Sequence, residues 1–177
     1  MGMKDIAVAL ERVRSVLARK PSLGMHDDAP ATARWEGGTR VVASHASGAR
    51  METDMPVELG GSGDRVPPGW LFRAGIASCT ATSIAMRAAL DGIDIGSLEV
   101  TVESRSDARG MLGMADEDGA IVGSGPCDLR MNVRIAAPGV TASRLRELVE
   151  NARACSPIPT AVHGGTPIPL SVDVQER

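Results

Sequence analysis

The chain has 177 residues, 43% of them hydrophobic and 23% charged, and a formal net charge of −3. This composition is typical of a globular protein, and the length favours one domain with one hydrophobic core. The slight negative charge, together with one Phe, two Trp and no Tyr, argues against nucleic-acid binding, which uses basic surfaces and stacking aromatic rings.

The sequence predicts a cytoplasmic protein without a membrane segment. No stretch approaches the roughly 18 apolar residues of a spanning helix, and the start of the chain lacks the basic-then-apolar pattern of a secretory signal. In a reducing cytoplasm the three cysteines are expected to be resting thiols or a redox pair. A metal site is the weakest interpretation, because the histidines show no ligand spacing with one another or with a cysteine.

The first predicted element is an amphipathic helix over residues 3–20. Its apolar side chains recur at the spacing of one helical face, at Ile6, Leu10, Val13 and Leu17. Pro21 ends the helix, and residues 21–30 have the composition of a connector. We therefore expect an N-terminal helix and linker, residues 1–30, followed by the main domain, residues 31–177.

The main domain is predicted to begin with three strands. Extended runs over residues 31–35, 40–45 and 50–55 are separated by turn signals at Gly37-Gly38 and Gly48, which is the pattern of a meander.

A long helix is predicted next, over residues 69–90. Pro68 suits its first turn, and Asp91-Gly92 ends it. Arg73 and Arg87 are its only charged residues, so much of its circumference must be buried. A helix of about 20 residues is about 30 Å long, and we expect it to be the central spine of the fold.

The second half of the chain adds strands and a shorter helix. Alternating apolar and polar residues predict strands over 97–104 and 129–135. Thr141 is the predicted N-cap of a helix that ends at Cys155, and residues 169–174 are predicted to form a last strand. This order of elements, without a repeated βαβ unit, indicates an α+β fold.

Two cysteines are candidates for chemistry, Cys79 in the long helix and Cys155 at the end of the shorter one. Thiols that are distant in sequence and adjacent in a fold can reduce peroxide, one attacking and the other closing a disulfide. A cysteine without such a partner is more often a small packing residue, and we assign that role to Cys127.

Two stretches resemble landmarks of the OsmC/Ohr family. Residues 68–79, Pro-Gly-Trp-Leu-Phe-Arg-Ala-Gly-Ile-Ala-Ser-Cys, are similar to the cysteine-bearing helix of that family, and residues 55–61 are similar to the loop before it. The second landmark, a cysteine and proline followed by alanine, glycine and a final strand, is matched by residues 155–174. The resemblance extends over residues 32–174.

The resemblance implies an OsmC-like fold, in which two antiparallel sheet halves surround the long helix within an intertwined homodimer. It also implies a cysteine-based peroxidase that reduces organic hydroperoxides in oxidative-stress defence. Cys79 would attack the peroxide and Cys155 would resolve the product. No bound cofactor or metal is implied, because an external dithiol such as dihydrolipoamide restores both thiols.

Peroxide cleavage needs a thiolate, and a free cysteine with a pKa near 8.5 is only a few per cent ionised at neutral pH. In the family an arginine of the first hairpin supplies positive charge, and a glutamate at the start of the long helix holds it. Arg40 is the match to that arginine, and Arg73 is a rival cation on the long helix.

The chain departs from the family at two positions. Gly69 stands where the family has its glutamate, so either Glu36, Glu58 or Asp64 takes that role from a loop, or the activity is altered or absent. Ser156 is inserted before the proline of the second landmark, and this insertion can shift the resolving thiol.

Two alternatives to the peroxidase stay open. With its glutamate lost, the same fold is a binding module for a lipid-like ligand at the dimer interface, an interpretation that Gly69 and Trp70 favour. The other alternative is a redox sensor, in which a disulfide switches a partner surface formed by the N-terminal helix.

Overall fold

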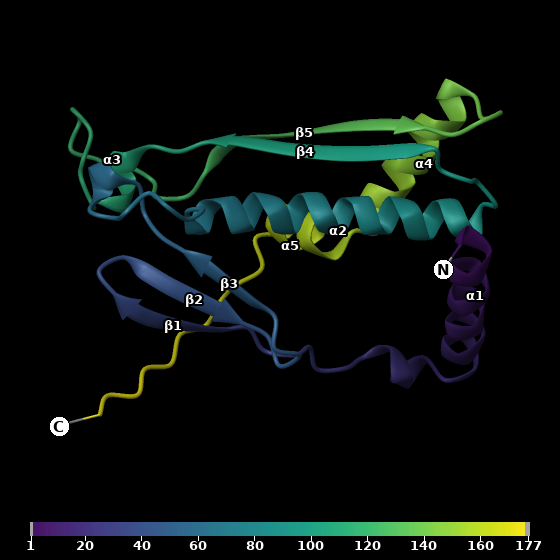
Figure 1. Cartoon of the computed structure of the whole chain (residues 1–177), viewed down its shortest axis with the longest axis horizontal. Coiled ribbons are helices and arrows are strands. Elements are labelled where there is room, and N and C mark those ends of the chain that lie inside the picture. Colours follow the sequence, from purple (N-terminus) through teal and green to yellow (C-terminus); the bar gives the residue numbers. More distant parts are fainter. Residues whose placement is uncertain (1, 176–177) are drawn as a thin grey trace.

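The computed structural model describes residues 2–175, which form two antiparallel sheets and several helices around one long helix. Figure 1 shows one sheet on each side of the long helix. The predicted α+β class is confirmed.

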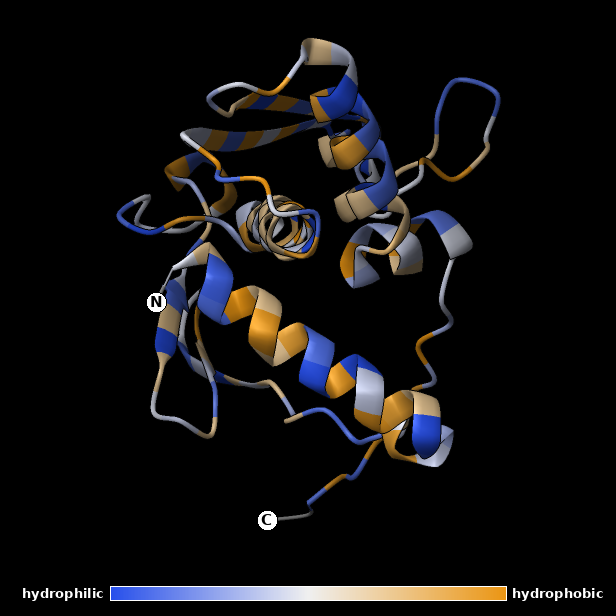
Figure 2. Cartoon of the chain, turned by 90° about the vertical axis from the view of Figure 1, so that its right-hand side faces the viewer, coloured by the Kyte–Doolittle hydropathy of each residue, from blue (hydrophilic) through white to orange (hydrophobic). Residues whose placement is uncertain are grey.

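The N-terminal helix, α1 (Met3–Arg19), lies at the surface of the chain. The Asp5 carboxylate accepts a hydrogen bond of 2.9 Å from the Gly2 amide, which satisfies a free donor at the start of the helix. None of its 17 residues is buried. Figure 2 looks along the long helix, α2 (Pro68–Leu90), and shows α1 beside it. Short 3-10 turns follow at Pro21–Gly24 and, further on, at Val57–Leu59.

The first sheet has the order β1-β2-β3, with β1 at Thr32–Gly37, β2 at Arg40–Ser44 and β3 at Arg50–Thr53. The meander is therefore as predicted. Gly37 and Gly38 make the first turn with φ of 116° and 56°, a region that favours glycine. Few of its side chains are buried, so this sheet contributes little to the core of a single chain.

The core lies where α2 meets the second sheet and α4 (Ala142–Ala154). α2 buries a stripe at four-residue spacing, Ile76, Thr80, Ile84 and Ala88. Ile84 packs there with Leu148 of α4, and both side chains are fully buried. The prediction that the long helix is the central spine is confirmed.

The second sheet pairs β4 (Ser97–Arg105) with β5 (Cys127–Ala136). Side chains along β4 alternate strictly between exposed and half-buried, as the sequence pattern predicts, and the half-buried ones face α2 and the core. The connection between the two strands contains one short helix, α3 (Ala108–Met111).

A further helix, α5 (Pro157–Gly164), was not predicted. Pro157 and Pro159 lie in its first turn, where backbone N–H groups have no intrahelical acceptor, so proline can open a helix there. Both α4 and α5 pack against α2. The junction between them, Cys155-Ser156, is therefore held beside the long helix.

The predicted last strand does not form. Residues 166–175 have no regular secondary structure, and four apolar side chains in this segment are 69% to 93% exposed: Ile168, Leu170, Val172 and Val174. The alternation is a strand pattern, but a strand also needs a neighbour for its hydrogen bonds. No strand within residues 2–175 provides one.

Candidate functional site

The two candidate cysteines line the same cavity, although they lie far apart in sequence. Cys79 is half-buried on α2, and Cys155 is exposed at the C-cap of α4. The cavity has a volume of about 480 Å³. Its other lining residues are Ser78, Thr82, Ser83, Met86, Pro157 and Ile158. Both cysteines are free thiols, so this site can hold two reactive sulfur atoms.

Two neutral donors of the α4–α5 junction point at the Cys79 sulfur. The Ser156 hydroxyl donates to Cys79 Sγ at 3.2 Å, and the Ile158 backbone N–H donates to the same atom at 3.5 Å. Ser156 is fully buried. No Lys, Arg or His is among the described residues that line this cavity.

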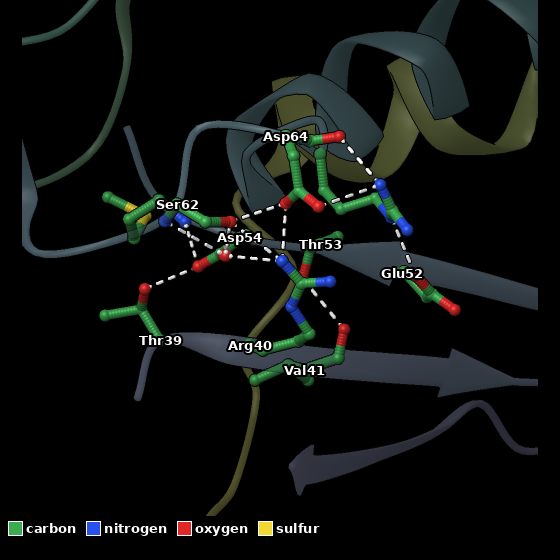
Figure 3. Close-up of polar contacts among 10 residues, drawn as sticks. Thr39, Arg40, Val41, Glu52, Thr53, Asp54, Ser62 and Asp64 are labelled. Carbon is green, nitrogen blue, oxygen red and sulfur yellow. Dashed lines mark hydrogen bonds and ion pairs between the residues drawn. The ribbon is translucent and has the colours of Figure 1, made fainter. Parts of the chain in front are cut away.

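Arg40 lies in a separate polar cluster at the start of β2. Its guanidinium donates to Asp54 at 3.0 Å and to the Ser62 hydroxyl at 2.8 Å, and it also pairs with Asp64. Figure 3 shows Arg40 between these acceptors. The hydrogen bonds that Arg40 donates to Asp54, and then to Asp64, raise the pKa of Arg40. Its positive charge is therefore matched by two carboxylates.

Asp54 is the most enclosed member of the cluster, with 4% of its surface exposed. Its carboxylate accepts the Ser62 hydroxyl at 2.6 Å and the Thr39 hydroxyl at 2.5 Å, in addition to Arg40. These hydroxyl groups, Ser62 first and then Thr39, hold the pKa of Asp54 well below its usual range against the opposing effect of burial. Asp54 is therefore a carboxylate that the fold keeps ionised.

Of the three acids considered for holding Arg40, only Asp64 contacts it. Neither Glu36 nor Glu58 forms an ion pair or hydrogen bond with Arg40 in the described structure. Asp54 was missed, yet a signal was present. The β2–β3 register pairs Val41 with Thr53, and continuing it by one residue places Arg40 opposite Asp54.

The rival cation, Arg73, faces away from the cysteines. It donates to the Ser104 hydroxyl at 3.2 Å and lines a different cavity, between α2 and β4. Cys127 is exposed at the start of β5, so the prediction that it packs in the interior is wrong. As the first residue of β5, it lies outside the core.

Residues 2–175 contain neither a cluster of metal ligands nor a helix that could span a membrane. No group of three or more His, Cys, Asp or Glu side chains is placed to hold a metal ion there. In the same part of the chain, every helix is too short or too polar to cross a membrane.

Known proteins resemble the chain in sequence. A family described as OsmC-like protein matches residues 61–171. An organic hydroperoxide resistance protein of Xanthomonas axonopodis pv. citri is 33% identical over 136 residues, which is 76% of this chain and 85% of that protein.

Solved structures resemble the fold. An organic hydroperoxide resistance protein of Elizabethkingia anophelis is 25% identical with a TM-score of 0.57, over 79% of this chain and 91% of that one. An OsmC like protein of Mycoplasma pneumoniae has a TM-score of 0.65 at 16% identity, over 79% and 90%.

Proposed function

This chain belongs to the family of OsmC-like proteins, and we propose that within it the chain reduces organic hydroperoxides through Cys79 and Cys155. A role in peroxide detoxification agrees with relatives named for organic hydroperoxide resistance. The observation that carries the cysteine mechanism is that the two thiols line one cavity. The peroxide and a reducing dithiol are the proposed small-molecule partners.

The proposed cycle has three steps. The Cys79 thiolate attacks the outer oxygen of the hydroperoxide, the O–O bond breaks, and the alkoxide leaves as an alcohol after taking a proton. Cys79 is then a sulfenic acid. The Cys155 thiol displaces its hydroxyl as water and forms a disulfide. A dithiol such as dihydrolipoamide reduces that disulfide, so both cysteines return to thiols and the dithiol becomes a cyclic disulfide.

Arg40 is the proposed source of positive charge, and it acts in a homodimer. Trp35 on the first sheet is 72% exposed, and the apolar side chains of residues 168–174 are also uncovered. These surfaces support an assembly in which a second copy covers them. In that assembly the first sheet of one subunit packs on the long helix of the other, and its Arg40 stabilises charge on the departing oxygen.

A turnover assay tests the proposal. Purified protein is expected to consume cumene hydroperoxide when dihydrolipoamide is supplied, and Cys79→Ser is expected to abolish consumption. Cys155→Ser should allow one round of oxidation, visible by mass spectrometry as a sulfenic acid on Cys79. Cys127→Ser is the matched control, because Cys127 is exposed and outside the cavity. If the unmodified protein consumes no hydroperoxide with any dithiol donor, the proposed peroxidase activity is refuted.

We place this activity in the cytoplasm, where glutathione and thioredoxin keep exposed thiols reduced. Cys155 and Cys127 are both exposed. Fractionation of the producing cells, with a blot for the protein in each compartment, tests this location.

A second candidate function is the binding of a lipid-like ligand without chemistry. A larger cavity, of about 590 Å³, lies among α2, β4, β5, α4 and α5, and its lining includes Ile76, Leu129, Met131 and Val149. Largely apolar cavities of this size suit small hydrophobic molecules. Native mass spectrometry of freshly purified protein would reveal such a ligand, and its presence in a protein that consumes no peroxide would favour binding over catalysis.

A further inference from the structure

The Ser156 hydroxyl donates its hydrogen bond to a sulfur atom, Cys79 Sγ. It is the N-cap residue of α5, and a serine at that position ordinarily accepts a hydrogen bond from the first turn of its own helix. Here the side chain makes no capping bond, and its hydroxyl donates to Cys79 Sγ at 3.2 Å instead. Pro159, at the third helical position, has no N–H, and the Ile158 N–H donates to Cys79 Sγ, so the usual donors of a capping bond are absent or already engaged.

The backbone on both sides holds Ser156 in place. Its N–H donates to the Arg153 carbonyl at 3.1 Å, and its carbonyl accepts the Thr160 N–H at 3.1 Å and the Thr160 hydroxyl at 2.8 Å. Pro157 also disfavours the helical region for the residue before it, and the Ser156 backbone is extended, with φ of −86° and ψ of 115°. The hydroxyl therefore reaches Cys79 from a position fixed by its neighbours.

The charge state of Cys79 determines how favourable this contact is. Ser156 is fully buried, and a buried hydroxyl without a good acceptor is costly. A neutral thiol is a weak acceptor, whereas hydrogen bonds to an ionised group are shorter and about twice as strong. A second donor, the Ile158 N–H, reaches the same sulfur at 3.5 Å. Both donors therefore favour the ionised sulfur.

We propose that Ser156 is a positioning residue whose hydroxyl, together with the Ile158 amide, favours and orients the thiolate form of Cys79. The proposal rests on the proposed function for its biological meaning, since a thiolate is what attacks a peroxide. It assigns a role to the residue that separates Cys155 from the proline. It also explains how Cys79 can be activated in a cavity whose described lining carries no cation.

The first test measures the pH dependence of Cys79 alkylation by iodoacetamide, in a Cys127→Ser, Cys155→Ser background where only Cys79 reacts. Ser156→Ala is expected to move the midpoint upward by roughly one pH unit, the size of one hydrogen bond to a charged acceptor. Alkylation at neutral pH should slow by up to about tenfold. An unchanged midpoint in folded Ser156→Ala protein overturns the proposal.

The matched control is Thr80→Val. Thr80 is also fully buried and follows Cys79 directly, but its hydroxyl donates to the Ile76 carbonyl of its own helix at 2.8 Å. This variant loses a buried hydroxyl without losing a donor to sulfur, so its alkylation midpoint should stay where it is. If Thr80→Val shifts the midpoint as far as Ser156→Ala does, the effect is a general loss of packing and the proposal fails.

If Ser156→Ala does not fold, a second variant tests whether the side chain at position 156 faces Cys79. Ser156→Cys in the same background places a thiol where the hydroxyl now faces Cys79. Diamide, which accepts two hydrogens, should then join the new thiol to Cys79 in an intramolecular disulfide, seen by mass spectrometry as the loss of two hydrogens. Folded protein that does not cross-link would show that this side chain does not face Cys79.

These tests separate the inference from the proposed function. Alkylation and cross-linking need no peroxide turnover. If the protein consumes no hydroperoxide but its alkylation midpoint depends on Ser156, the peroxidase activity is refuted and the role of Ser156 is supported. If the protein consumes hydroperoxide but Ser156→Ala leaves the alkylation midpoint unchanged, the peroxidase activity is supported and the role of Ser156 is refuted.

Discussion

The cavity around Cys79 and the cluster around Arg40 differ in the charge of the groups that surround the central residue. In the cavity, a sulfur that carries negative charge in the proposed reaction is met by a neutral hydroxyl and a neutral amide. In the cluster, a permanent positive charge is met by two carboxylates, Asp54 and Asp64. The comparison teaches that within one chain the charge of Arg40 is already matched by carboxylates, so Arg40 could act on Cys79 only through the geometry of the proposed homodimer.

The largest expected effect follows from removing the cation. Arg40→Ala is expected to lower the rate of hydroperoxide consumption by roughly a hundredfold, as loss of one donor to a developing oxyanion typically does. Arg50→Ala is a matched control, because Arg50 lies on the same hairpin but is largely exposed and pairs with Glu36. Steady-state assays of both variants make the measurement. Equal rates for Arg40→Ala and the unmodified protein would show that Arg40 does not assist the reaction and that Cys79 relies on its neutral donors.

The next effect concerns stability in acid. The pKa of Asp54 is depressed, so its contribution to stability is present above the ordinary pKa of about 4 and is lost as the pH falls through the lower folded value. The urea midpoint of the unmodified protein should therefore fall as the pH drops below about 4. In Asp54→Asn this fall should be smaller, and the midpoint at neutral pH should be lower than in the unmodified protein.

Glu117→Gln serves as the control for that titration, because Glu117 is an exposed acid in the loop between β4 and β5. Its urea midpoints are expected to follow those of the unmodified protein at every pH. A fall in acid that is identical in Asp54→Asn would mean that other carboxylates carry the pH dependence.

A smaller effect is expected for the second carboxylate. The Asp64 side chain is 47% exposed, and the Ser62 hydroxyl, followed by Arg40, lowers its pKa. Solvent screens such a pair, and Arg40 keeps Asp54 when Asp64 is replaced. Asp64→Asn should therefore lower the neutral urea midpoint less than Asp54→Asn does. The reverse order would show that the exposed acid is the main partner of Arg40.

The smallest effect is expected from placing a carboxylate at Gly69, where the family resemblance implies a glutamate. A side chain at Gly69 has open space, and its nearest neighbour is the Arg73 guanidinium, 3.8 Å from an added Cβ. In Gly69→Glu the new carboxylate can pair with Arg73 one turn further along α2. Hydroperoxide consumption should change by less than about twofold. A rise beyond about tenfold would mean that the carboxylate reaches Arg40 and that its absence limits the unmodified protein.

Much of this fold could be predicted from the sequence, because periodicity reports burial. The long helix and the alternating strands were predicted close to their observed bounds, since each presents a regular apolar face. Helix α5 was missed because prolines usually end helices, and only their place in the first turn makes them compatible with one. The last strand failed for another reason, because alternation describes one strand and says nothing about whether a neighbour exists.

The candidate site was predictable in its residue types and not in its contacts. Cys79 and Cys155 could be singled out, and the cavity that they share came from the packing of α4 and α5 on α2. Ser156 was visible only as an insertion, because the direction of one hydroxyl depends on a junction between two helices. Asp54 could have been found by extending the β2–β3 register past the last pair.

The uncovered segment after α5 has a practical consequence for handling the protein. From Ala154 to Gln175 the chain has no Lys or Arg, so trypsin has no cleavage site in this segment. Leu170, 87% exposed in the lone chain, is a natural site for a chymotrypsin-like protease. If a second copy covers this segment, as proposed for the homodimer, cleavage at Leu170 should become faster as the sample is diluted.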